Sequence, residues 1–98
     1  MEHVAKIDFF HVKKSAIILR ALNHQLRQQI FKLLEEKEKL TVTDIYKHLK
    51  LEQSVASQHL AILRRAGIVR TERDGKFVFY ILNHKRIDQI DRSIKELM

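Results

Sequence analysis

A run of polar and mostly uncharged side chains between residues 53 and 64 has the types and spacing for hydrogen bonding to an external ligand. Apolar Ala56, Leu60 and Leu63 recur at helical spacing and predict a helix over about residues 53–66, of which they form the inner face. The opposite face then carries Gln53, Ser54, Ser57, Gln58, Ala61 and Arg64, with Val55 at its edge. Hydroxyls and amides suit contacts with base edges and phosphates, a glutamine can pair with adenine through two hydrogen bonds, and a valine can contact a thymine methyl. We interpret this face as a surface that reads double-stranded DNA, because a purely solvated face in so charged a chain would carry more Lys and Glu.

The charge of the chain is concentrated around the same segment. The 98 residues contain 19 Lys and Arg against 12 Asp and Glu, a formal net charge of +7. Between residues 47 and 86 there are nine basic and three acidic residues, a difference of +6. A positive surface of this kind attracts an anionic partner such as DNA.

Several other kinds of chemistry are excluded or disfavoured by residue type. The absence of cysteine excludes disulfides, thiol catalysis and thiolate metal sites. No two of the six histidines lie three or four residues apart, so no helix carries a local metal-binding pair. There is no glycine-rich phosphate loop and no Ser–His–acid set that the predicted helices bring together. We therefore expect a protein that is not an enzyme and has no catalytic residues, no cofactor and no metal ion.

The apolar segments are also too short for a membrane protein. The longest run, Phe77 to Leu82, has six residues, whereas a bilayer requires about 20. A signal peptide has a basic segment followed by an apolar one, and the first residues of this sequence do not show that pattern. We expect no membrane association and a cytoplasmic location.

Two helices are predicted before the polar segment. The first covers about residues 8–22 and has Asp8 as a plausible N-cap, and Asn23 is predicted to cap the second. The apolar positions of the second helix are Leu26, Ile30, Leu33 and Leu34. The charged residues 35–39 are interpreted as its solvated end.

A third and a last helix complete the helical part. The third covers about residues 42–49 and begins with a capping-box pattern formed by Thr41 and Asp44. Its predicted buried residues are Val42, Ile45 and Leu49. The last covers about residues 84–97, where isoleucine and leucine repeat at intervals of three and four residues, as in a coiled-coil seam.

The two glycines of the chain mark the ends of elements. Gly67 stands where a helix ends in a left-handed conformation, which glycine adopts without a steric penalty. Asp74-Gly75 is a strong hairpin signal, and residues 68–73 and 76–82 on either side of it have the period of strands.

This order of elements predicts a mainly α fold of the winged helix-turn-helix type, in a single domain covering residues 1–98. The helix-turn-helix would occupy residues 42–66 and the β-hairpin wing residues 68–82. The helices at about 8–22 and 84–97 flank this unit. In such a fold the second helix of the pair enters the major groove and the hairpin lies along the DNA backbone.

The sequence resembles the ArsR/SmtB family of dimeric winged-helix repressors over about residues 19–82. The most specific segment is QSVASQHLAILRRAGIV at residues 53–69, followed by a charged wing and Phe-Val-Phe-Tyr. The resemblance implies that Gln53, Ser54, Ser57 and Gln58 lie on the recognition helix, and Arg73 and Lys76 on the wing. The sequence departs from the family at Glu52, where a capping serine is common.

The resemblance also implies a homodimer, because the first and last helices form the dimer interface in this family. The sequence supports this independently, since a helix as short as residues 84–97 is marginal unless its apolar face is buried. The first helix carries excess apolar surface as well, because Ile17 and Ala21 widen its stripe. The predicted interface consists of Phe9, Val12, Ala16, Leu19, Ile87, Ile90, Ile94 and Leu97. Such a dimer would bind an inverted repeat with half-sites about one helical turn apart.

The metal-sensing sites of the family are not matched. Thr41 and Thr43 stand where one type of site has cysteines, and neither is a ligand for a soft metal. The other type uses Asp and His on the last helix, where this chain has His84 and no second histidine. The expected function is therefore that of a repressor without either site.

Alternatives remain at this stage. The repressor could sense a metal through other histidines, respond to a small-molecule or protein effector, or act without a signal. A winged-helix module that binds proteins and not DNA is a further alternative. That module would be expected to have an acidic or apolar recognition helix, whereas this one is polar and ends in Arg64 and Arg65.

Overall fold

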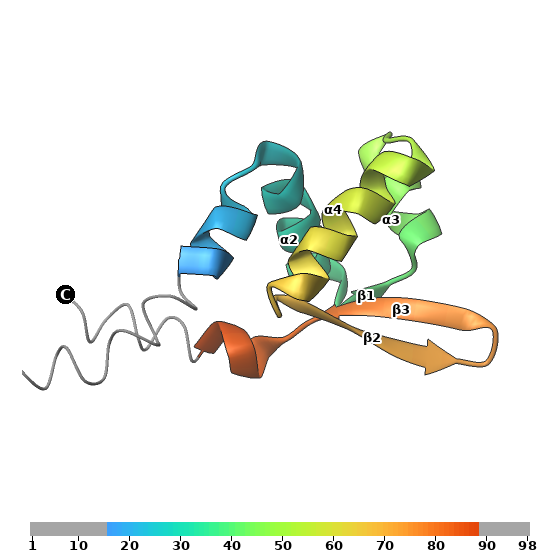
Figure 1. Cartoon of the computed structure of the whole chain (residues 1–98). Helices are drawn as coiled ribbons and strands as arrows, with labels where there is room; N and C mark the ends of the chain where they lie inside the picture. Colours follow the sequence, from blue (N-terminus) through green and yellow to red (C-terminus); the bar gives the residue numbers. More distant parts are fainter. Residues whose placement is uncertain (1–15, 89–98) are drawn as a thin grey trace, which may run out of the picture.

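The computed structural model describes residues 16–88. Residues 16–22 are helical and are followed by α2 (Gln25–Lys37), β1 (Lys39–Leu40), α3 (Val42–Leu49) and α4 (Gln53–Arg65). The strands β2 (Val69–Asp74) and β3 (Phe77–Leu82) come next, and residues 84–88 are again helical. The helices gather on one side, and the β2–β3 hairpin projects away from them (Figure 1). This is the predicted winged helix-turn-helix arrangement, and the predicted fold class is confirmed.

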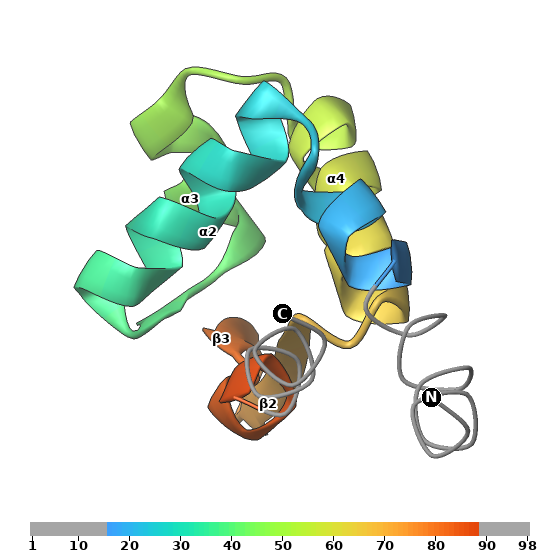
Figure 2. The same cartoon turned by 90° about the vertical axis from the view of Figure 1, so that its left-hand side faces the viewer.

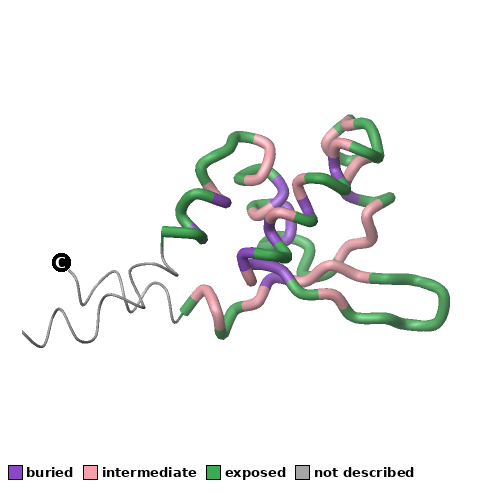
Figure 3. Tube along the Cα trace, in the orientation of Figure 1, coloured by how far each residue is buried: buried purple, intermediate pink, exposed green. Residues whose placement is uncertain are grey.

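The core lies where α2, α3 and α4 meet the base of the hairpin. Its largest fully buried side chains are Ile30, Leu34, Ile45, Leu60, Leu63, Ile68 and Leu82. Burial of each such side chain contributes about 1.5–3 kcal/mol. The outer half of the hairpin remains exposed (Figure 3). One side of α4 therefore packs against the core, and its opposite side and the wing remain accessible to a partner.

The helix ends follow local capping rules, with one correction. Thr41 accepts a hydrogen bond from the Asp44 backbone N–H, and the Asp44 carboxylate accepts one from the Thr41 N–H, which confirms the capping box. The predicted N-cap of α2, Asn23, is wrong by one residue. His24 is the N-cap, and its Nδ1 accepts a hydrogen bond from the Leu26 N–H at 3.1 Å. An unprotonated imidazole nitrogen can replace the usual side-chain oxygen because it offers the same acceptor.

The sheet contains one strand more than the sequence predicted. The strand order is β1-β3-β2 and both pairings are antiparallel. Lys39, interpreted above as part of a solvated helix end, pairs with Ile81, because α2 stops at Lys37 and the chain turns at Glu38 with φ +69°. β1 has only two residues, too few to show the alternating pattern by which a strand is predicted.

The hairpin turn is also shifted by one residue from its predicted place. Asp74 pairs with Phe77, so the two loop residues are Gly75 and Lys76, not Asp74 and Gly75. Gly75 has φ +62°, and Lys76 has no positive φ. A positive φ at the first loop position alone is the pattern of a type II′ turn, which explains why glycine stands there.

The helix at residues 16–22 packs against the rest of the molecule beside α4 (Figure 2). Its inward side consists of Ile18 and Ala21, which are 2% and 5% exposed. Ala16 and Leu19, both predicted at the dimer interface, are exposed. The face that packs within the chain is therefore not the face that carries these two residues.

Of the other predicted interface residues, one packs within its own chain and the rest lie outside the described residues. Ile87 is partly buried and packs against the core of its own chain. Phe9, Val12, Ile90, Ile94 and Leu97 lie outside the described residues.

Candidate nucleic-acid interface

A tight turn between α3 and α4 orients the recognition helix. Lys50 ends α3 in the left-handed region with φ 56° and ψ 47°. The Leu51 N–H then donates to the Tyr46 carbonyl at 2.9 Å, which closes the turn. Leu49 and Leu51 are half-buried and hold this connection against the molecule. The start of α4 is therefore placed by backbone hydrogen bonds and by apolar contacts.

α4 has the buried side and the exposed side that the sequence predicted. Ala56, Leu60 and Leu63 are fully buried. The opposite side carries Gln53, Ser54, Ser57, Gln58 and Arg64, all exposed, and Val55 is half-buried at its edge. Within residues 16–88, no hydrogen bond or ion pair engages any of these polar side chains. Their donors and acceptors face outward and are available to an external partner.

The N-terminus of α4 adds a feature of its own. Glu52 is the N-cap and makes no side-chain capping hydrogen bond, so the first-turn N–H groups receive no side-chain acceptor. Free N–H groups and the helix dipole favour an anion such as a phosphate at this end. The Glu52 carboxylate beside them opposes such an anion, and this is the local consequence of the departure noted in the sequence.

The wing carries cations near its tip. Arg73 and Lys76 are exposed, and the Lys76 ammonium lies 5.5 Å from the centre of the Phe77 ring. Arg70 lies near the start of β2 and, unlike these two residues, forms an ion pair, in which its guanidinium is 2.6 Å from the Glu72 carboxylate. The structure thus leaves the two predicted wing residues without a carboxylate partner among the described residues.

The sequence did not single out Tyr80, which lies next to the recognition helix. A surface hollow of about 460 Å³ between α4 and β3 is lined by Ser57, Ala61, Arg64, Arg65 and Tyr80. The phenol therefore stands beside two of the predicted contact residues. Tyr80 is half-buried like its neighbours on β3, and only the packing of the wing against α4 places it beside these residues.

Two histidines from distant parts of the sequence come together where the start of α2 meets α4. The rings of His24 and His59 are 4.6 Å apart between centroids, and Arg27 Nη1 lies 3.4 Å from His59 Nδ1. Burial lowers the pKa of His59 below its usual value, and the nearby His24 and Arg27 lower it further. The arginine places a positive charge beside the pair, which disfavours a metal cation there. Among residues 16–88, no group of three or more His, Cys, Asp and Glu could hold a metal ion.

Over the same part of the chain, no helix combines the length and the apolar character needed to cross a bilayer.

The chain is similar to known transcriptional regulators. Residues 24–71 match the family model described as bacterial regulatory protein, arsR family. An HTH-type transcriptional regulator of Methanocaldococcus jannaschii is 36% identical over 85 residues, which are 87% of this chain and 96% of that protein.

Two further relatives have solved structures. The transcriptional repressor PagR of Bacillus anthracis is 32% identical over 94% of this chain and 92% of its own length. The crystal structure of PagR has a TM-score of 0.75 and covers 92% of this chain and 99% of that one. The transcriptional activator HlyU of Vibrio cholerae is 39% identical over 76% of this chain and 68% of its own length. The structure of reduced HlyU has a TM-score of 0.71 and covers 94% of this chain and 93% of that one.

Proposed function

The chain belongs to the arsR family of bacterial regulatory proteins, and from this premise we propose that it is a dimeric repressor that binds an inverted-repeat operator. Members of the family are DNA-binding transcriptional regulators, which are not enzymes. The family resemblance and the prediction that the chain is not an enzyme are therefore confirmed. The remaining parts of the proposal are sequence-specific reading by α4, dimerisation, repression and the absence of the usual metal sensors.

The exposed face of α4 is the observation that carries the proposal. Side chains that can pair with base edges, Gln53, Ser57 and Gln58 among them, face outward without partners among the described residues. Base contacts require such unengaged donors and acceptors, and cations strengthen the contacts with phosphates. Arg73 and Lys76 on the wing are suited to the second task.

Repression is proposed from the similarity to PagR, which is named a repressor and aligns with 94% of this chain and 92% of its own length. A repressor needs only to occupy its operator, and a winged-helix dimer is sufficient for that purpose.

An exposed apolar side chain supports dimerisation. Leu19 is 54% exposed and lies on the side of the helix at residues 16–22 that faces away from Ala21. A large apolar side chain left exposed on a surface favours contact with another apolar surface. A second copy of the chain offers the same residue, as a twofold interface requires.

The positions of the threonines support the absence of a sensor at α3. The hydroxyl of Thr41 is engaged in the capping box, and the carboxylate of Asp44 is engaged with the Thr41 N–H. A metal at this place would have to displace both hydrogen bonds and would find oxygen ligands in place of thiolates.

The proposal is tested by selecting bound duplexes from a random pool and measuring affinity for the recovered site. We expect an inverted repeat and a salt slope of about −0.9 for each phosphate neutralised, between about 50 and 200 mM salt. Failure to recover a motif would contradict sequence-specific reading, and affinity independent of salt would contradict DNA binding itself.

Two variants separate base reading from phosphate contact. Gln58→Ala should cost about 1–3 kcal/mol on the selected site and relax one base position. Lys76→Ala should weaken selected and random duplexes alike and reduce the salt slope by about 1. Base reading by Gln58 would be wrong if its substitution weakened both duplexes equally.

A further inference from the structure

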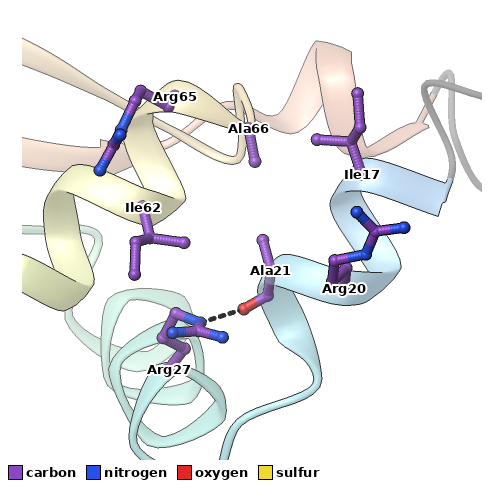
Figure 4. Close-up of a pocket in the computed structure, with 7 residues that line it drawn as sticks. All are labelled: Ile17, Arg20, Ala21, Arg27, Ile62, Arg65 and Ala66. Atoms are coloured by element: carbon purple, nitrogen blue, oxygen red, sulfur yellow. Dashed lines mark hydrogen bonds between the residues drawn. The ribbon is translucent and has the colours of Figure 1, made fainter.

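A cavity that is open to solvent lies between the helix at residues 16–22 and the C-terminal half of α4. Its volume is about 360 Å³, near the lower limit for a small-molecule site. Figure 4 shows Ile62 and Ala66 on one side of the space and Ile17 and Ala21 on the other, with the methyl groups of Ala21 and Ala66 directed toward each other. Four apolar side chains thus form the larger part of its wall.

Three arginines complete the wall, and no carboxylate from residues 16–88 lines it. Arg27 rises from α2 below the space, and its Nε donates a hydrogen bond to the carbonyl of Ala21 (Figure 4). Arg65 lies back along α4, where its Nε contacts the Ala61 carbonyl at 3.4 Å. Arg20 has no hydrogen-bond or ion-pair partner for its guanidinium among residues 16–88.

This combination selects a ligand class. Three cations without a counter-charge among residues 16–88 favour an anion, and the planar guanidinium of an arginine matches a carboxylate through two hydrogen bonds. The apolar walls favour a ligand whose remaining atoms are apolar, which excludes a free inorganic phosphate as the best occupant. At about 30 Å³ for each water-sized group, the cavity has room for about a dozen heavy atoms.

We propose that this cavity binds a small organic carboxylate with an apolar body, and that such a compound is the effector of the regulator. The carboxylate pairs with Arg20 and Arg27, and the apolar body packs between α4 and the helix at residues 16–22. A ligand there contacts the recognition helix and the helix of the proposed dimer interface together, so it can change how the two α4 helices of a dimer are spaced. The binding site stands on the cavity alone, whereas the effector role rests on the proposed function.

Calorimetric titration of the full chain without DNA tests the site, with 2-naphthoate as the probe and the neutral 2-naphthamide as its matched control. We expect naphthoate to bind at least about tenfold more tightly than the amide, because only the carboxylate forms charged hydrogen bonds with arginine. Arg20→Gln should weaken naphthoate binding by about tenfold. Arg64→Gln, an exposed arginine of α4 outside the cavity, should leave it unchanged.

The site would be overturned by absent naphthoate binding, by equal binding of acid and amide, or by equal effects of the two arginine substitutions. If Arg20→Gln weakened duplex binding while naphthoate did not bind, the arginine would contact a DNA phosphate instead. The effector role is tested by duplex affinity with saturating naphthoate, and an unchanged affinity would overturn it. A chain that bound naphthoate and no duplex would contradict the proposed function and leave the site intact.

Discussion

At the residue scale, Thr41 illustrates how one side chain is committed to structure at a position where relatives of this family can carry a sensor. Its hydroxyl accepts from the Asp44 N–H at 3.1 Å, and the Asp44 carboxylate accepts from the Thr41 N–H at the same distance. Together these bonds satisfy two backbone donors at the start of α3 that the helix itself leaves unpaired. We therefore assign this position to stability.

This assignment leads to a prediction about stability. Thr41→Ala should lower the free energy of unfolding by about 1 kcal/mol, because the cap acceptor is lost. Thr43→Ala is the matched control, since Thr43 is exposed in the same first turn and its effect should stay within about 0.5 kcal/mol. Urea unfolding followed by circular dichroism measures both changes. Equal losses in the two variants would contradict a capping role for Thr41.

At the element scale, the end of α4 determines where the wing begins. The Gly67 N–H bonds to the Arg64 carbonyl at 3.0 Å and the Ile68 N–H to the Leu63 carbonyl at 3.0 Å, which together form a Schellman motif. Gly67 has the required positive φ of +80°. Ile68 and Leu63, which such a motif brings together, are both fully buried. The recognition helix is therefore joined to β2 by a rigid connection.

A substitution at this connection should be costly. Gly67→Ala is expected to lower the free energy of unfolding by about 1–2 kcal/mol, because a residue with a Cβ pays for a positive φ. The added Cβ would also lie 3.1 Å from the flexible Arg86 side chain, which would have to move. Gly67→Asn should cost less, since asparagine tolerates this conformation. Thermal unfolding compares the two, and an alanine variant as stable as the unaltered chain would contradict this account.

At the scale of the whole molecule, some apolar side chains of the flanking helices pack within the chain and others remain exposed. Ile18, Ala21 and Ile87 pack within the chain. Leu19 is left outside, on the side of the same helix that faces away from Ala21. A second copy covering this side chain would account for apolar surface that the core of one chain does not use.

The proposed dimer is tested by one pair of variants. Leu19→Glu should convert the dimer to a monomer in sedimentation velocity and weaken operator binding, because a charge in an apolar interface has no partner. Phe77→Glu is the matched control for mass, since Phe77 is similarly exposed (52% against 54%) but lies on the wing. The proposed interface would be wrong if Leu19→Glu kept the mass of a dimer, or if both variants became monomers.

The elements that could be predicted from the sequence are those governed by neighbours within a few residues. The capping box at Thr41, the left-handed Gly67 and the inner face of α4 each depend on spacing along one helix. The turn at Gly75 and the N-cap at His24 each lie one residue from the predicted position, so such rules place the end of an element to within about one residue. The exposed polar face of α4 followed from the same periodicity, so most of the candidate DNA surface could be predicted as well.

The sequence by itself determined the order of the helices and the hairpin, the outward face of α4 and the concentration of positive charge. Only the tertiary structure decided which distant residues meet: Lys39 with Ile81, His24 with His59, and Tyr80 beside Ser57. The cavity bordered by Arg20, Arg27 and Arg65 belongs to the same group. The physical reason is that helix periodicity and capping act along the chain over one or two turns. Contacts between elements depend instead on how their faces pack, and packing is a property of the assembled core.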